Sequence, residues 1–194
     1  MVALSSIGAN LPSGTGPIVG LHDFEEMLKS IPKLSVVALR PAFFMENHLA
    51  SIPLIKNAGI NGSAARADVA RAMIATRDIA AVAAEYLIAP AFDGYTVREL
   101  LGPRDYTYRE ATSILGAAIG KPDLAYVEFS YEDFHKGILG AGFSPSAADA
   151  LVESTRAHNE GRIQSTVSRN ESNTTPTTLE VFAREVFAPA YQVS

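Results

Sequence analysis

The sequence predicts an α/β fold in which a parallel sheet is flanked by helices. One observation is the continuous, valine-rich apolar run from Ser35 to Leu39, which is typical of a strand covered on both faces in a parallel sheet. A second is the order of elements, because the short apolar run Val2 to Leu4 comes first and a segment with apolar residues at helical spacing, Leu21 to Ser30, follows it. Strand, helix and strand in this order form a β–α–β unit, whose ligands bind at the carboxyl ends of the strands.

The first part of the chain supplies the edge at which such a ligand would bind. The strand Val2 to Leu4 is followed by a loop rich in glycine and proline that extends to Gly20. The helix Leu21 to Ser30 carries acidic residues in its early turns, where the helix dipole favours them, and Pro32 ends it. The residues expected at the carboxyl edge of the two strands are Ser5, Ser6, Pro41 and Ala42.

The remaining elements follow from periodicity and from local breaks. We expect residues 43–57 to be helical and the glycine-containing residues 57–65 to form a flexible loop. Asp78 is placed to cap a helix over the apolar run Ile79 to Ile88. Two Thr-x-x-Glu patterns, at Thr107 and Thr177, predict capping boxes. Further expected strands are Ala72 to Ala75, Val97 to Leu101 and Ala125 to Phe129, and further helices begin at Ser130 and Ser144.

The composition excludes several classes of function. With 16 Lys and Arg against 21 Asp and Glu, the net charge of the 194 residues is −5, so direct contact with nucleic acid is not expected. The absence of cysteine excludes disulfides and thiolate chemistry and is consistent with a cytoplasmic protein. The most apolar stretch, Ile79 to Phe92, contains Glu85 and Pro90 and is too short to span a membrane. The histidines are too widely spaced to suggest a metal site.

Three segments, in this order and spacing, resemble the NmrA-like family of atypical short-chain dehydrogenase/reductase relatives. They are VALSSIGANLPSGTGPI (2–18), VALRPAFFMENHL (37–49) and TRDIAAVAAEYL (76–87). The downstream segment ELLGPRDYTYREATSILGAAIGKP (99–122) and the helix end at His158 resemble the substrate lobe of the same family. The resemblance therefore extends over nearly the whole chain.

The resemblance implies a Rossmann-like fold that binds NADP(H). In the family, a GxxGxxG turn after the first strand brings backbone amides to the cofactor pyrophosphate, and this chain contains no such turn. The match begins at what is a middle strand of the family's sheet. The expected organisation is therefore the C-terminal part of a Rossmann-like domain in residues 1–94, with a partial parallel sheet, and a small α/β substrate lobe in residues 95–194. On this resemblance we expect a chain that is either truncated or has lost half of a cofactor site.

Three functions remain open on this basis. The first is an NADPH-dependent reductase of quinone, azo or similar conjugated acceptors, which are small molecules. The alternative is a non-catalytic NADP(H) redox sensor that binds a regulator, and the absence of the Tyr-x-x-x-Lys pair supports it. The third is a remnant that no longer binds the cofactor.

The resemblance also assigns roles to individual residues. It places an acceptor against an apolar wall of Phe43, Phe44 and Met45. Ser6 and His22 are the candidate catalytic residues, and His22 is the only group near its position that titrates near neutrality. Plainer interpretations are a loop cap for the serines, a solvent-facing His22 and an ordinary core for the Phe and Met side chains. The cofactor-binding residues that the resemblance implies are Ser5, Ser6, Pro41, Ala42, Phe43 and Asn47.

The first strand has a consequence for self-association. A parallel strand normally pairs on both sides, and the strand Val2 to Leu4 lacks a neighbour on one side in the family-like arrangement. An exposed apolar strand edge pairs readily with another chain. We therefore expect a homodimer formed through this edge, or poor solubility.

Overall fold

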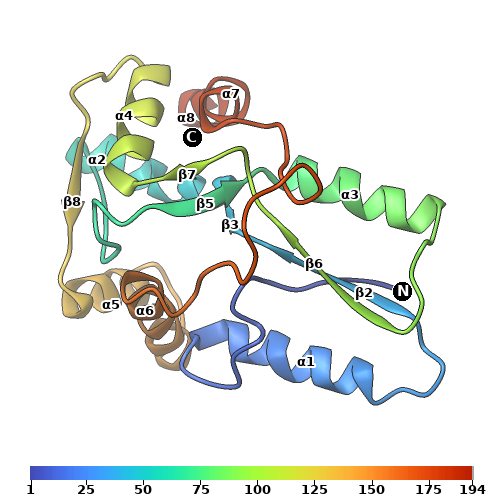
Figure 1. Cartoon of the computed structure of the whole chain (residues 1–194). Helices are drawn as coiled ribbons and strands as arrows, with labels where there is room; N and C mark the ends of the chain where they lie inside the picture. Colours follow the sequence, from blue (N-terminus) through green and yellow to red (C-terminus); the bar gives the residue numbers. More distant parts are fainter. Residues whose placement is uncertain (194) are drawn as a thin grey trace.

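The computed structural model describes residues 1–193, which form three small sheets surrounded by helices (Figure 1). Its central sheet consists of three parallel strands in the order β1 (Val2–Leu4), β2 (Val36–Pro41) and β6 (Tyr95–Leu100). β2 lies between the other two strands, and its six residues are all buried. The doubly covered parallel strand expected from the sequence is confirmed.

Helices cover the two faces of this sheet. Consecutive strand residues point to opposite faces, so the side chains of β2 contribute to two separate cores. Helix α1 (Val19–Lys29) packs against the face that carries Val36, and helix α3 (Thr76–Ile88) packs against the face that carries Val37 and Leu39. The α/β class, with a parallel sheet flanked by helices, is confirmed.

One acidic residue of α1 faces the interior rather than the solvent. The helix begins at Val19, directly after a 3-10 turn at Gly16–Ile18, so its first turn contains no acidic residue. Glu25 is only 1% exposed and pairs with Arg40 of β2. The expectation that the acids of this helix interact with its dipole is therefore wrong for Glu25, which instead ties α1 to the sheet.

Residues 43–58 differ from the single helical segment that the sequence predicts. Phe43–Phe44 form strand β3, Met45–Ser51 form a 3-10 helix, and only Ile52–Ala58 form an α-helix, α2. β3 pairs with β5 (Arg71–Ile74), which also pairs with β7 (Asp105–Tyr106). The partner of β3 lies far along the chain, so local periodicity carries no signal for it.

The flexible loop expected at residues 57–65 is also wrong. Gly59 ends α2 in the left-handed conformation with a φ of 70°, and Ile60–Ser63 then form β4, parallel to β8 (Ala125–Glu128). A Cβ atom at position 62 would lie 2.7 Å from the ring of Phe129, so Gly62 permits this close approach. Gly62, which resembles a loop residue in the sequence, is therefore required by the packing of this strand.

The capping box at Thr107 is confirmed at the start of α4 (Tyr108–Ala118). The Glu110 amide donates to the Thr107 hydroxyl oxygen at 3.1 Å, and the Thr107 amide donates to the Glu110 carboxylate at 3.4 Å. The two reciprocal bonds satisfy amides that a helix start otherwise leaves unpaired.

The caps expected at Thr177 and Asp78 are wrong. Thr178, one position later, accepts the hydrogen bond from the first turn of α7 (Leu179–Phe182). Thr177 instead donates to the carboxylate of Asp78, while Ala75 occupies the N-cap position of α3. Both residues are used in a long-range contact, which a short capping pattern does not reveal.

A second apolar core lies beside the central sheet and holds the other elements together. Its buried members include Met45, Ile55, Met73, Leu115 and Phe182. They come from the 3-10 helix, α2, β5, α4 and α7, so this core connects both halves of the chain. Ser130 and Ser144 cap helices as expected. The remaining elements are α5 (Tyr131–Gly140), α6 (Pro145–Asn159), a π-helical turn (Ala183–Phe187) and α8 (Ala188–Val193).

The sheets contain strands from both halves of the chain. β6, which begins at residue 95, joins the central sheet, and β8 from the second half pairs with β4 from the first. The division into residues 1–94 and 95–194 stays a prediction about independent folding units.

β1 forms one edge of the central sheet. Among the described strands its only partner is β2. The last residue of β1, Leu4, is 53% exposed. Within residues 1–193, none of the helices is both long enough and apolar enough to cross a membrane.

Candidate functional site

A cavity of about 1190 Å³ lies at the carboxyl ends of β1 and β2. Ser5 and Ser6, which follow β1, and Pro41 and Ala42, at the end of β2, all line it. The sequence predicts these four residues at one edge of the sheet, and the structure brings them together there. Their roles in binding stay predictions.

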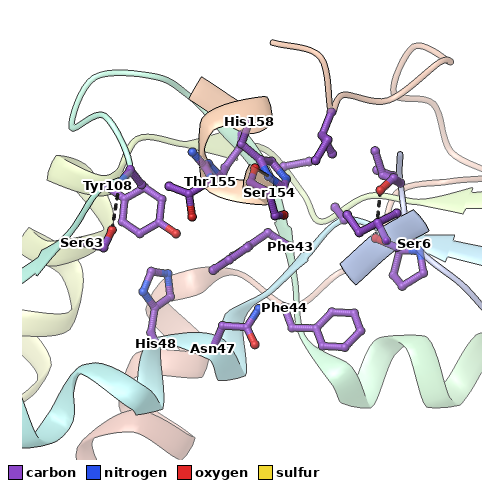
Figure 2. Close-up of a pocket in the computed structure, with 18 of the residues that line it drawn as sticks. Ser6, Phe43, Phe44, Asn47, His48, Ser63, Tyr108, Ser154, Thr155 and His158 are labelled. Atoms are coloured by element: carbon purple, nitrogen blue, oxygen red, sulfur yellow. Dashed lines mark hydrogen bonds between the residues drawn. The ribbon is translucent and has the colours of Figure 1, made fainter. Parts of the chain in front are cut away.

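Other walls of the cavity come from β3, the following 3-10 helix, β4, α4 and α6. Figure 2 shows Ser6 at one end, His48 and Tyr108 at the other end, and Phe43 between them. His158 of α6 faces the same space. Because the walls come from segments separated by more than a hundred residues, the cavity depends on the complete tertiary structure.

The two serines after β1 differ in their availability. Ser5 is buried, and its hydroxyl donates to Oε1 of Glu25 at 2.5 Å. The same carboxylate accepts two hydrogen bonds from Arg40, at 2.8 and 2.5 Å, and one from the Tyr95 hydroxyl at 2.6 Å. Burial by itself raises the pKa of Glu25, but these hydrogen bonds outweigh it and hold that pKa below its usual value. Ser5 is therefore committed to an internal network.

Ser6 remains at the cavity wall. It is half-buried, and its hydroxyl donates to the neighbouring carbonyl oxygen of Ile7 at 2.9 Å. This bond lies within one turn of backbone and can be exchanged for a bond to a ligand. Of the two serines, Ser6 is the one whose hydroxyl is available to a bound molecule.

Two of the residues assigned from the sequence lie outside the cavity wall. The Nδ1 atom of His22 donates to the carbonyl oxygen of Ala9 at 2.9 Å, and this contact stabilises the loop before α1. Met45 is fully buried and packs with Ile55 and Met73 in the second core.

Phe43, Phe44 and Asn47, to which the family resemblance assigns binding roles, line the cavity, and those roles stay predictions. Phe43 packs edge-to-face against His48, with ring centroids 5.6 Å apart, and against Tyr108, at 6.0 Å. Within residues 1–193, no hydrogen bond joins the carboxamide of Asn47 to another residue. The cavity therefore combines aromatic walls with a polar group that is free to bind a ligand.

Sequence reasoning did not assign a role to the two histidines of the cavity. Burial, reinforced by the charge of Arg71, lowers the pKa of His48 to about 4. The same two causes lower the pKa of His158 to about 4, although its hydrogen bond to the Ser154 carbonyl opposes them. Both imidazoles are neutral at pH 7. The one feature of the sequence that could have pointed to these histidines is their position inside the segments that carry the family resemblance.

Arg71, Tyr108 and Tyr126 were also missed. Tyr108 and Tyr126 stack with ring centroids 5.3 Å apart, and the Tyr126 hydroxyl donates to the Ala65 carbonyl at 2.7 Å. Arg71 reaches the cavity because β5 pairs with β3, a long-range pairing without a local sequence signal. No three His, Asp or Glu side chains in residues 1–193 lie close enough together to hold a metal ion.

Solved structures with the same arrangement of elements include reductases, a regulator and a nucleoside-diphosphate-sugar epimerase. An NADPH-dependent quinone oxidoreductase from Escherichia coli, QOR2, matches with a TM-score of 0.79 and 25% identity over 96% of this chain. Triphenylmethane reductase from Citrobacter sp. matches with a TM-score of 0.71 and 17% identity over 94% of this chain. NmrA, a negative transcriptional regulator solved in complex with NADP, matches with a TM-score of 0.66 and 12% identity over 99%.

The chain has the NmrA-like fold. The resemblance read from the three sequence segments is thereby confirmed, as is the Rossmann-like arrangement it implies. No family model and no curated protein matches the sequence.

The NmrA-like fold is present here over part of its length. The chain covers 66% of the quinone oxidoreductase, 63% of the triphenylmethane reductase and 65% of NmrA. The activities of those complete proteins therefore apply to this chain only as proposals.

Proposed function

We propose that this chain is the nicotinamide- and acceptor-binding part of an NADPH-dependent reductase of planar conjugated acceptors, such as quinones. The observation that carries the proposal is the aromatic-walled cavity at the carboxyl ends of β1 and β2, bordered by the unpaired carboxamide of Asn47. Parallel α/β sheets bind their ligands at this edge. The similarity to a quinone oxidoreductase supports the choice of acceptor.

The residues present fit one end of NADP(H). Asn47 can exchange hydrogen bonds with the nicotinamide carboxamide, and Pro41 and Ala42 let a flat ring approach the strand end closely. The residues present supply no glycine-rich cradle for the pyrophosphate end, because the sequence contains no GxxGxxG turn. NADPH, when bound, supplies a hydride.

The chain's own groups orient the acceptor and keep its surroundings apolar. Phe43 and Phe44 offer flat surfaces for a conjugated ring, and Ser6 can donate a hydrogen bond to an acceptor oxygen. A general acid works best when its pKa lies near the working pH. His48 and His158 have pKa values of about 4 and are neutral at pH 7, so neither is suited to donate the proton. The proton for the reduced acceptor then comes from solvent in the open cavity. His22 and Met45 have no role in this proposal.

Titration with NADPH tests the proposal directly. The chain contains no tryptophan, so nicotinamide fluorescence reports binding without interference. We expect saturable binding at micromolar NADPH, and about tenfold weaker binding for Asn47→Ala, which removes one hydrogen-bonding group. Asn57→Ala, at an exposed position on α2, is the matched control. Absence of binding at millimolar NADPH would overturn the proposal.

A non-catalytic NADP(H) sensor is the second candidate. The lowered pKa values of both cavity histidines, and the missing Tyr-x-x-x-Lys pair, leave the cavity without a proton donor matched to neutral pH. Steady oxidation of NADPH in the presence of menadione favours the reductase. Binding of NADPH without turnover favours the sensor.

Location and assembly complete the proposal. The absence of cysteine supports a reducing compartment such as the cytoplasm. The exposed edge of β1 supports a homodimer formed by strand pairing.

A further inference from the structure

Arg71 carries a positive charge at the wall of the cavity without a hydrogen-bonding partner. It is the first residue of β5, and its partly exposed side chain lines the cavity. Its Nε and Nη2 atoms are shielded from solvent and donate no hydrogen bond to any of the described residues. Hydrogen-bonding groups that are withdrawn from water without a partner destabilise a structure, so they bind a suitable ligand strongly.

Arg40 shows how the corresponding two nitrogen atoms of another arginine in this protein bind a carboxylate. Its Nε and Nη2 atoms bind the two carboxylate oxygens of Glu25, at 2.8 and 2.5 Å. This side-on fork matches the geometry of a carboxylate. Arg71 presents the same fork, and no carboxylate of residues 1–193 lies against it.

The other charged groups around the cavity do not neutralise Arg71. Glu46 accepts hydrogen bonds from the amide and hydroxyl of Thr76, and Asp105 pairs with Arg169. The remaining titratable groups of the wall are neutral at pH 7. They are the imidazoles of His48 and His158, whose pKa values are lowered, and the phenols of Tyr108 and Tyr126, whose pKa values burial raises.

Aromatic rings flank the guanidinium. Its central carbon lies 4.8 Å from the ring centroid of Tyr108 and 5.9 Å from that of Phe43. Cation–π attraction of this kind holds the guanidinium in place but leaves its N–H groups unbonded. A ligand that satisfies both features has a flat ring for the aromatic wall and an anionic oxygen for the guanidinium.

We infer that Arg71 forms an anion-binding subsite, which takes the carboxylate or phenolate oxygen of a planar aromatic ligand in the cavity. This inference rests on the proposed function in one respect, since it makes the acceptor an aromatic compound with an acidic oxygen. Binding at the subsite itself needs no cofactor.

The test compares two probes of the same shape, 2-naphthoate and 2-naphthamide, by isothermal titration calorimetry of the full chain without NADPH. We expect 2-naphthoate to bind at least about tenfold more tightly than its neutral amide. Arg71→Met removes the charge and should abolish this preference, while Arg71→Lys, which keeps the charge, should retain part of it. Arg66→Met, at an exposed position outside the cavity, is the matched control and should preserve it.

Several outcomes would overturn the inference. Equal affinity of the wild-type chain for the two probes would do so, as would no binding of 2-naphthoate at millimolar concentration. An unchanged preference in a folded Arg71→Met variant would also do so, with folding checked by circular dichroism. If that variant does not fold, the comparison of probes on the wild-type chain still decides.

The outcome is independent of the NADPH titration. Preferential binding of 2-naphthoate together with no binding of NADPH would support the subsite and overturn the proposed reductase. A second measurement links the two, because the KM for 2-hydroxy-1,4-naphthoquinone, which is anionic at neutral pH, should be lower than the KM for 1,4-naphthoquinone. The Arg71→Met variant should lose this difference.

Discussion

Thr177 binds both carboxylate oxygens of Asp78, although 99 positions separate the two residues. Its amide donates to Oδ2 at 3.0 Å, and its hydroxyl donates to Oδ1 at 2.6 Å. Asp78 is only 8% exposed, so its carboxylate depends on these partners. The contact fastens the C-terminal segment to the beginning of α3, next to the second core.

Replacement of this threonine should destabilise the protein. Thr177→Val removes the hydroxyl that binds Asp78 and leaves a buried carboxylate oxygen without a partner, which costs about 1–3 kcal/mol. Urea unfolding followed by circular dichroism measures the change. Ser113→Ala, at an exposed position on α4, is the control and should leave stability unchanged within about 0.5 kcal/mol. Equal stability of the two variants would contradict the assigned contact.

Glu25 should contribute to the acid sensitivity of the fold. The pKa of Glu25 in the folded state lies below its usual value of 4.5. As the pH falls, Glu25 is therefore protonated at a higher pH in the unfolded chain than in the folded chain. The stability advantage of the wild type over Glu25→Gln is therefore full above pH 4.5 and shrinks as the pH falls below it. Urea unfolding at a series of pH values measures this difference. Glu171→Gln, at an exposed position, controls for the loss of one charge, and an advantage that grows on acidification would refute the role of Glu25.

His48 should titrate far below an ordinary histidine. Burial and the charge of Arg71 lower its pKa to about 4, from 6.5. Between these two pH values the unfolded chain is protonated at this residue and the folded chain is not, so acidification destabilises the fold by up to about 3 kcal/mol. Nuclear magnetic resonance of the histidine rings, with His48→Gln for assignment, measures the midpoint. A midpoint near 6.5 would show that the imidazole is not buried as described.

Two glycines of the first loop and helix should respond in opposite ways to alanine. Gly16 has a φ of 61°, and a Cβ atom there would lie 2.0 Å from the Ala150 carbonyl of α6, so Gly16→Ala should destabilise the protein by about 1–3 kcal/mol. Gly20 lies in α1 with no atom near its Cβ position, so Gly20→Ala should be neutral or stabilising by up to about 1 kcal/mol. Thermal unfolding of the two variants provides the comparison, and the same sign for both would be inconsistent with the packing of α6 against this loop.

The exposed edge of β1 should cause self-association. Sedimentation velocity over a range of concentrations should show a dimer, and Leu4→Lys should shift the chain toward the monomer, because a charge on an edge strand opposes pairing. Met27→Lys replaces another exposed apolar side chain, on α1 away from the edge, and serves as the control. A wild-type chain that stays monomeric at high concentration would argue against pairing through β1.

Local patterns in the sequence were sufficient for the central β–α–β unit and for several caps. The valine-rich run of β2 and the helical spacing of α1 depend on neighbours in the sequence, and so does the capping box at Thr107. The position of the ligand edge followed from these elements, since parallel strands of one sheet end on the same side. Ser6 could be assigned to this edge for that reason, whereas Asn47 was assigned from the family resemblance.

The other features depend on partners that lie far apart in the chain. β4 is a strand only because β8 pairs with it, and Thr177 leaves the expected capping position because it binds Asp78 instead. Arg71 acquires its unpaired charge beside Tyr108 only when β5 has joined β3. The sequence by itself determined the class of fold and the edge that holds the cavity, since short-range periodicity specifies them. Tertiary structure decided which side chains face that cavity and which of them carry a charge, because burial and electrostatic environment arise only when distant segments pack together.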